Sequence, residues 1–396
     1  MGNGDTRLPV KAILLIVPGT AGGFLSFYLL FPVIPRYAQA GGASALVAGL
    51  STTAFIVATV LAQPVTTRVF PAIGYPRSLT SGAMALGLGA LPMIISASPA
   101  MILGCAIVRG AGFGIFVVAG VAALTAAMPL ARRGFGVGLY GAASGLAGIA
   151  GSPAGPWIAS RYGFHAAFVI AALSPLLSLP AVLVVDLPRP ARIAASRIAR
   201  AFRAHARPFL IEMASSAAFG VVFTFLPLVI ATGRAWLVSA ALLTQQLFAV
   251  TTRWLAGPWG DRHGSERLLA PGIVLAAVGL CGAIWSGQPV VLLTGMALFG
   301  LGFGTLQSAT FVTILKRSPA GEAETSVSII WNLAFDGGTG IGSACGGVVF
   351  QFAGHQLLFG LSALAMLTTL RAARTISRHP AGPVSSTSDY PAAAPP

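Results

Sequence analysis

Charged side chains are scarce in this sequence, and that scarcity excludes an ordinary water-soluble fold. Only 8% of the 396 residues are charged, whereas 56% are hydrophobic. A typical soluble domain is about 25% charged, so a soluble fold of this length would lack the charged surface that it needs. The composition therefore predicts an integral membrane protein.

Residues that form metal sites, disulfides and catalytic sets are also few. The three cysteines, Cys105, Cys281 and Cys345, lie far apart in apolar segments, and the five histidines are scattered. This pattern indicates neither a disulfide framework nor a metal site. A P-loop and a His-Glu-x-x-His motif are both lacking, which argues against ATP-driven transport by that route and against metalloprotease chemistry. We expect no enzyme activity, no metal and no cofactor.

Apolar runs, by contrast, fill the chain. Most of them have the ~20 residues that cross ~30 Å of hydrocarbon. Glycine and proline are frequent inside them, which membrane helices tolerate because neighbouring helices satisfy the freed backbone groups. The twelve predicted spans are 12–34, 44–66, 78–97, 100–127, 135–158, 165–185, 208–230, 236–256, 268–286, 289–314, 325–350 and 355–371.

One pattern of residues occurs twice, 190 or 191 positions apart. The repeated segments are 74–77 with 264–267, 110–114 with 300–304, and 161–168 with 352–359. Two similar halves that both span the membrane are the arrangement of a secondary transporter, whose binding site lies between the repeats. We therefore expect an all-α membrane protein in which twelve helices form two pseudo-symmetric bundles of six.

The expected division of the chain follows from this repeat. An arginine-rich segment between the halves either forms an amphipathic helix on the membrane surface or is a solvated linker. The final segment is rich in Pro, Ser and Ala and is expected to be disordered. The predicted parts are a first bundle at 1–186, a basic linker at 187–207, a second bundle at 208–375 and a tail at 376–396.

The basic residues are distributed unevenly between the two sides of the predicted membrane. With both termini in the cytoplasm, 20 of the 24 basic residues fall on the inside. Three, Arg36, Arg161 and Arg234, fall outside, and Arg109 is the one placed well within a span. This is the positive-inside rule, so the net charge of +15 indicates contact with anionic lipid at the inner face and not nucleic-acid binding. The expected location is a bacterial cytoplasmic membrane, since loops are short and Arg outnumbers Lys.

Three segments carry motifs. The segment from Gly257 to Arg267 reads Gly-Pro-Trp-Gly-Asp-Arg-His-Gly-Ser-Glu-Arg, whereas its first-half equivalent at 67–77 keeps Gly74 and Arg77 but has Thr67 and Pro71 in place of Gly and Asp. Arg109 begins an Arg-Gly-Ala-Gly-Phe-Gly run. The fifth span carries Gly141, Gly145, Gly148 and Gly151, followed by Ser152-Pro153-Ala-Gly155-Pro156.

These motifs and the two six-helix halves resemble the major facilitator superfamily, over residues of about 10–375. The first motif matches the family's G-x-x-x-D-R-x-G-x-x-R loop, which in the family latches one side of the transporter. The resemblance implies gating roles for Gly257, Asp261, Arg262, Gly264 and Arg267, with Arg77 from the weakened first copy. The glycine-rich stretch resembles that of exporting, antiporting branches and adds Pro153 and Gly155 to the gating set. Generic helix packing explains the same glycines equally simply.

Only two acidic residues fall within predicted spans. Asp336 is about ten residues into the eleventh span, where an ionised Asp costs ~2.5–3.5 kcal/mol on insertion scales. Burial favours the protonated form of a carboxyl, so Asp336 is the leading candidate for proton coupling. Glu212 is the second candidate, although its place near the inner end of a helix allows it simply to reach water. No acid occurs between Asp5 and Asp186, which disfavours a simple organic cation as substrate.

Candidate substrate contacts combine the one buried arginine with the few polar residues of the cavity-lining helices that the resemblance implies. Arg109 is either a counter-charge or substrate-anion ligand, or a residue that clamps helices through backbone carbonyls. The other candidates are Ser26, Tyr28, Thr224, Gln307 and Asn332. Each is equally well explained as an interhelical hydrogen bond. Gln63, Gln245 and Gln246 are expected to flank the contact between the halves.

The combined prediction is a monomeric secondary transporter that works by alternating access. The favoured function is proton-coupled export of a small amphipathic drug or metabolite, powered by the proton gradient. Two alternatives remain open from the sequence. One is uptake of a nutrient or metabolite, and the other, from a different class, is a membrane receptor or scaffold that no longer transports.

Overall fold

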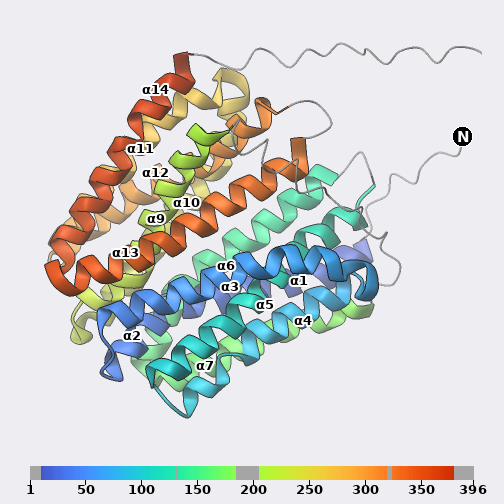
Figure 1. Cartoon of the computed structure of the whole chain (residues 1–396), viewed down its shortest axis with the longest axis horizontal. Coiled ribbons are helices and arrows are strands. Elements are labelled where there is room, and N and C mark those ends of the chain that lie inside the picture. Colours follow the sequence, from blue (N-terminus) through green and yellow to red (C-terminus); the bar gives the residue numbers. More distant parts are fainter. Residues whose placement is uncertain (1–9, 130–132, 184–204, 319–322, 379–396) are drawn as a thin grey trace, which may run out of the picture.

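The computed structural model describes residues 10–129, 133–183, 205–318 and 323–378, and every regular element in those ranges is helical (Figure 1). The linker predicted at 187–207 and the tail predicted at 376–396 lie mostly outside them. The elements of the first half are α1 (Val10–Leu30), α2 (Val33–Ala40), α3 (Ala45–Ile73), α4 (Tyr75–Leu88), η1 (Leu91–Ile94), α5 (Pro99–Ala127), α6 (Arg133–Tyr162), α7 (Phe164–Leu173) and η3 (Ser174–Leu183). Those of the second half are α9 (Ala206–Val229), η4 (Thr232–Arg234), α10 (Ala235–His263), η5 (Ser265–Leu268), α11 (Leu269–Gly282), η6 (Ala283–Trp285), α12 (Pro289–Lys316), α13 (Ala323–Thr368) and α14 (Leu370–Arg378).

Several helix boundaries coincide with glycines in the left-handed region of backbone conformation. Gly74 and Gly264 have φ values of 77° and 94°, and Gly163 and Gly354 have values of 87° and 77°. Only glycine adopts such angles without a steric penalty. Gly354 divides α13 into two helices. When helices that continue across a kink are grouped, the described ranges contain twelve successive rods. Eight helical stretches in these ranges are long and apolar enough to cross a membrane, and one of them, Ile330–Arg378, includes the break at Gly354.

The sequence repeat corresponds to a repeated packing contact. A Cβ atom on Gly110 of α5 would lie 2.1 Å from the carbonyl oxygen of Phe55 in α3. A Cβ on Gly300 of α12 would lie 2.3 Å from the carbonyl oxygen of Gln245 in α10. Both pairs are therefore in direct backbone contact, and the members of each pair are 190 residues from their counterparts. The two halves use the same close approach of helices that small residues permit in membranes.

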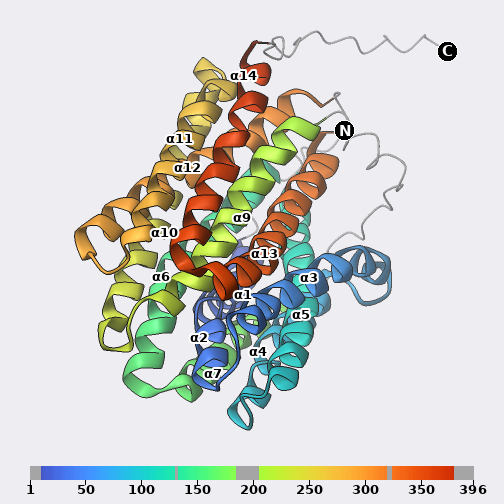
Figure 2. The same ribbon diagram turned by 60° about the vertical axis from the view of Figure 1, so that its left-hand side comes forward.

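The two halves lie side by side and meet along two contacts, with the second half above the first in Figure 1. We call the contact of α3 with α13 the polar seam, because Ala45, Thr53 and Gln63 make hydrogen bonds there to α13. Figure 2 shows these two helices next to one another. We call the contact of α6 with α10 the glycine seam, because Gly145 and Gly148 of α6 face Val250 and Gln246 of α10.

The contacts between the halves are concentrated away from one end of the molecule. We call the end where α1 begins and α14 ends the basic end. Hydrogen bonds cross the polar seam from Ala45, at the opposite end, down to Gln63 and Asp336. Phe31 also stacks on Phe223, with ring centroids 5.5 Å apart. Of the hydrogen bonds across the polar seam between described residues, the Gln63–Asp336 bond lies nearest the basic end and the others lie toward the far end.

Two sequence-based boundaries need correction. Helix α14 continues to Arg378, so residues 376–378, assigned to the tail, are helical. Arg253 is one of the 20 basic residues that the sequence places on the inside, but it lies within α10, about three turns before that helix ends. Its place inside a helix matters for the site described next.

Candidate functional site

A buried carboxylate network lies in the interior of the second half. The side chain of Glu212 in α9 is 0% exposed, so it does not reach water as its position in the sequence allowed. It accepts hydrogen bonds from Gln307 Nε2 at 2.9 Å, from Thr310 Oγ1 at 2.7 Å and from Ser216 Oγ at 3.2 Å. Trp331 Nε1 of α13 donates to the same Thr310 hydroxyl at 3.1 Å. The network therefore joins α9, α12 and α13.

Arg253 extends this network toward the contact between the halves. Its Nη2 donates to Gln307 Oε1 at 2.7 Å, while the amide nitrogen of Gln307 is bonded to Glu212. One glutamine thus bridges a guanidinium and a carboxylate. The Nε of Arg253 is buried and has no hydrogen-bond partner in the described part of the chain. Arg253 is not among the predicted site residues, although it lies within the predicted span 236–256, 190 residues after Gln63.

Asp336 lies at the contact between the halves. It belongs to α13, is 5% exposed, and its Oδ2 accepts a hydrogen bond from Gln63 Nε2 of α3 at 2.9 Å. The predicted place of Gln63 beside the contact is thus observed. A carboxylate whose hydrogen-bond donor belongs to the other half responds directly to any separation of the two halves.

Two tyrosines of the first half complete the centre. Tyr28 of α1 is within electrostatic range of Arg253, and Tyr140 of α6 is within electrostatic range of Tyr28 and Asp336. Tyr140 also donates to the carbonyl of Val117 at 3.3 Å. Tyr28 was predicted as a candidate contact, whereas Tyr140 was not singled out. Charged and phenolic groups from both halves therefore face a common region.

Arg109 is separate from this region. It is 2% exposed, and its Nε donates to the Leu86 carbonyl at 3.1 Å and its Nη2 to the Ser26 carbonyl at 3.5 Å. The guanidinium carbon lies 5.6 Å from the centre of the Phe55 ring, within cation–π range. Arg109 and Asp336 thus form no direct pair: the described partners of Arg109 are carbonyls and a ring, all in its own half.

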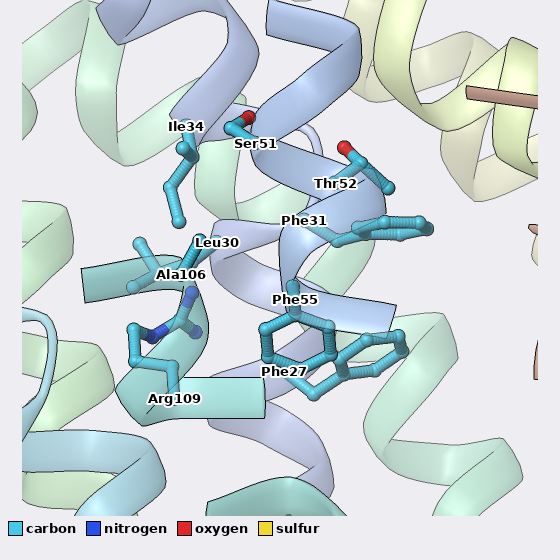
Figure 3. A pocket seen from close by; sticks show the side chains of 9 residues that line it. All are labelled: Phe27, Leu30, Phe31, Ile34, Ser51, Thr52, Phe55, Ala106 and Arg109. Carbon is cyan, nitrogen blue, oxygen red and sulfur yellow. The ribbon is translucent and has the colours of Figure 1, made fainter. Parts of the chain in front are cut away.

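The space beside Arg109 is a small cavity in the first half, shown in Figure 3. Its volume is about 20 Å³, which is room for about one water molecule. In this conformation it therefore has no room for an organic substrate. The lining residues are Phe27, Leu30, Phe31, Ile34, Ser51, Thr52, Phe55, Ala106 and Arg109.

Two other predicted substrate contacts also lie away from the cluster. The Ser26 hydroxyl is buried without a partner in the described residues. The Thr224 hydroxyl is 3.1 Å from that of Thr52 in α3 and 3.2 Å from that of Ser343 in α13. Thr224 therefore takes part in a chain of hydroxyls that joins the two halves toward the far end, which we call the closed end. Asn332 lies on α13, one turn before Asp336, and is half-buried.

The predicted gating loop links elements of the second half. Gly257 and Arg262 lie within α10, Gly264 forms the turn and Arg267 lies in η5. Ser265 Oγ is 3.1 Å from Thr313 Oγ1 of α12, and Ser377 Oγ of α14 donates to the Glu266 carbonyl at 2.9 Å. Arg77, Arg262 and Arg267 are exposed, and the side chain of Asp261 lies outside the described part. The observed contacts hold this loop against its own half.

The glycine-rich stretch of α6 packs on α1. A Cβ on Gly155 would lie 2.0 Å from the carbonyl oxygen of Leu29, and Pro153 lies within the same helix. The stretch therefore allows the backbones of α1 and α6 to touch. This contact accounts for the small residues as packing, and a gating role for Pro153 and Gly155 stays a prediction.

Comparisons with known proteins agree with the fold. A family model described as the Major Facilitator Superfamily matches residues 16–329 and 208–394. No curated protein sequence matches the chain. The solved structure of the nucleoside transporter NupG is similar at a TM-score of 0.68 and 15% identity, covering 94% of this chain and 100% of that one. A bacterial homolog of the human lysosomal transporter Spinster, in an inward-facing and unoccupied conformation, is similar at a TM-score of 0.76 and 14% identity, covering 96% and 100%.

Proposed function

Because this chain belongs to the major facilitator superfamily, and is therefore a membrane transporter and not an enzyme, we propose that it exports a small amphipathic compound in exchange for protons. In this proposal the basic end faces the cytoplasm of a bacterium. We infer that the structure represents the state in which the site is open to the inside, because the hydrogen bonds across the polar seam lie toward the far end.

The observation that carries the proposal is the Asp336–Gln63 hydrogen bond between the halves. Opening the far end requires α3 and α13 to separate, and separation removes the donor from the carboxylate while admitting water from outside. A protonated Asp336 returns to the closed contact at a lower cost than an ionised one, because an ion loses more hydration energy on burial. Proton uptake at Asp336 thus favours closing of the far end.

Glu212 supports the proposal as a second proton site. Thr310 has a single hydroxyl proton, yet its Oγ1 is 2.7 Å from both the Leu306 carbonyl and Glu212 Oε2. A protonated Glu212 satisfies both contacts, since it donates to Thr310 while Thr310 donates to Leu306. In the ionised state Thr310 instead bonds to Glu212, and the network shifts. The hydrogen bonds around Glu212 therefore depend on its protonation.

We assign roles to the remaining predicted substrate and gating residues from their positions in the fold. Tyr28, Gln307 and Asn332 are proposed contacts for the substrate, while Thr224 and Ser26 belong to the closed end and to the support of Arg109. The 257–267 loop and Arg77 are proposed to gate the basic end. The few fixed charges in the centre and the phenylalanines around it suit an amphipathic molecule, bound by a monomer without a cofactor.

The test begins with a growth screen that finds a toxic compound to which the gene confers resistance. In proteoliposomes, an imposed pH gradient should drive uphill movement of that compound by the wild type. Asp336→Asn should abolish the uphill movement while exchange of compound across the membrane continues, and Asp389→Asn, which removes a carboxylate from the tail, should behave as wild type. Unchanged pH-driven transport by Asp336→Asn would contradict the coupling role, and accumulation in right-side-out vesicles in place of inside-out ones would favour uptake.

A further inference from the structure

We propose that Arg253 is the residue that binds an anionic group of the substrate, so that the transported compound is an amphipathic organic anion or zwitterion. This inference rests on the proposed transport function and names the substrate class. It starts from the guanidinium of Arg253, which lies on the face of α10 that forms the glycine seam.

The hydrogen bonding of Arg253 is incomplete in a way that fits an oxyanion. Its Nη2 is bonded to Gln307, but its buried Nε has no partner in the described residues. A buried donor without a partner costs free energy. Carboxylates, sulfonates and phosphates bind guanidinium edges through parallel N–H···O bonds, so such a group would satisfy the Nε.

The nearest carboxylate does not fill this role. Gln307 stands between Arg253 and Glu212, and all three bonds made by the Glu212 side chain go to other residues. Gln307 thereby orients the guanidinium without neutralising it by direct contact. By contrast, Arg109 is held by two backbone carbonyls and lies beside a cavity of about 20 Å³, too small for an organic anion.

The two helices of the glycine seam are not in contact along their whole length. Gln246, Val250 and Arg253 lie on one face of α10, since they are spaced at helical intervals. A Cβ on Gly148 would meet Gln246 at 2.3 Å and one on Gly145 would meet Val250 at 3.4 Å, whereas one on Gly141 would meet nothing within 4 Å. The two helices of the glycine seam therefore diverge about a turn before the level of Arg253.

Groups from the other half border the same space. The ring of Tyr28 lies beside Gln246 at the glycine seam, since a Cβ on Gly148 would lie 3.2 Å from Tyr28 Cζ and 2.3 Å from Gln246 Nε2. The hydroxyl of Tyr28 can donate to an anion. The first half contributes no acid there, because residues 6–185 contain none. On the side of the first half, an anion beside Arg253 would thus meet a phenol and no carboxylate.

The experiment measures equilibrium binding by calorimetry to the full chain in lipid nanodiscs, with empty nanodiscs subtracted. The probes are 2-naphthoate, the neutral 2-naphthamide and the cation 2-naphthylmethylammonium. Wild type should bind naphthoate roughly 10- to 100-fold more tightly than naphthamide, as expected for hydrogen bonds to a charged group, and should bind the cation more weakly than the amide.

Variants separate binding from structure. Arg253→Gln should remove the preference for naphthoate while leaving naphthamide affinity within about twofold, which also shows that the variant is folded. Arg253→Lys should retain part of the preference, and the control Arg161→Gln, which removes an exposed arginine from the last turn of α6, should retain all of it. A wild type that binds naphthoate no more tightly than naphthamide, or not at all, would overturn the proposal, as would an intact preference in Arg253→Gln.

These outcomes are distinct from those of the transport test. Binding is measured without a pH gradient, so an Asp336 that plays no role in coupling leaves the Arg253 result unaffected. Conversely, proton-coupled transport of a neutral or cationic compound would uphold the proposed function and contradict the anion site.

Discussion

The polar seam and the glycine seam occupy equivalent places in the two repeats but are built from different chemistry. Gln63 of α3 and Arg253 of α10 are 190 residues apart and so correspond to one another. Gln63 reaches across its seam to Asp336. Arg253 turns to Gln307 within its own half, and the first half offers it no carboxylate, since residues 6–185 contain no acid. One seam thus carries a specific polar link between halves, and the other carries glycines beside an arginine whose Nε is unpaired.

A second pair of equivalent positions shows the same divergence. In the first half Arg109 lies over the ring of Phe55, while the residues 190 positions later are Phe299 and Gln245. Gln245 is 0% exposed and its amide has no partner in the described residues. The repeated glycines preserve the backbone contacts in both halves. The side chains at equivalent positions differ in polarity, since the arginine corresponds to a phenylalanine and the phenylalanine to a glutamine. The duplication therefore determines the scaffold, and the asymmetry between the seams determines the chemistry.

The largest expected effect comes from locking the closed end. Thr52 and Thr224 have Oγ1 atoms 3.1 Å apart, in different halves, so two sulfurs at these positions come near the disulfide bonding distance of about 2.05 Å. In a background lacking Cys105, Cys281 and Cys345, Thr52→Cys with Thr224→Cys should lose essentially all transport on oxidation, because the far end must open. Transport should return with reductant, and each single variant should be insensitive. Full activity of the cross-linked protein would mean that these helices do not separate.

The next effect concerns the network that supports Arg253. Glu212→Ala leaves Gln307 and Thr310 without their shared acceptor in a buried site, and we expect a loss of about 2–4 kcal/mol of stability. Glu212→Gln should lose much less, because an amide fills the same space and still accepts hydrogen bonds. Thermal unfolding in one detergent compares the variants. Equal melting temperatures for Glu212→Ala and wild type would show that the network is not structural.

A smaller effect distinguishes the two seams directly. Gln63→Leu removes the donor to Asp336, and a hydrogen bond to a charged group contributes about 1.5–3 kcal/mol. The ratio of inward-open to outward-open molecules should therefore fall roughly 10-fold or more. Gln246→Leu, on the glycine seam, is the matched control and should shift the ratio less, since no hydrogen bond of Gln246 crosses that seam among the described residues. Distances between spin labels placed at the two ends of the molecule measure this ratio in both variants. A larger shift for Gln246→Leu would reverse the comparison.

Sequence reasoning predicts the scaffold because the scaffold depends on local and repeated features. Apolar runs, glycines with φ above zero and the 190-residue offset define where helices begin, end and pack. The partners of polar side chains depend instead on how helices from different halves are rotated toward each other, which periodicity does not determine. For this reason the sequence predicts that Asp336 is buried but does not identify Gln63 as its partner. Arg253 is counted with the basic residues on the inside because it lies near the end of its predicted span, 236–256.

The smallest expected effect lies at the basic end of the second half. His205 precedes α9 and is buried, with its Nε2 3.1 Å from the Ser318 hydroxyl. Burial, and then the Arg317 guanidinium, lower the pKa of His205 below its ordinary value. The unfolded chain therefore takes up a proton at a higher pH than the folded one. Stability that is fully present above about pH 6.5 should fall as the pH drops through the lowered pKa, by about 1.4 kcal/mol for each pKa unit of difference.

Replacing this histidine isolates its contribution from that of the carboxylates. His205→Gln keeps a group that can hydrogen-bond to Ser318 but does not titrate, so its melting temperature should fall less than that of wild type between pH 7.5 and pH 5. His165→Gln, which replaces an exposed histidine in the first turn of α7, is the matched control. An identical pH dependence in His205→Gln and wild type would mean that His205 is protonated equally in the folded and unfolded chains. A difference confined to His205→Gln would show that the contact of His205 with Ser318, between the start of α9 and the end of α12, makes stability depend on pH. Neither seam contains such an imidazole contact among the described residues.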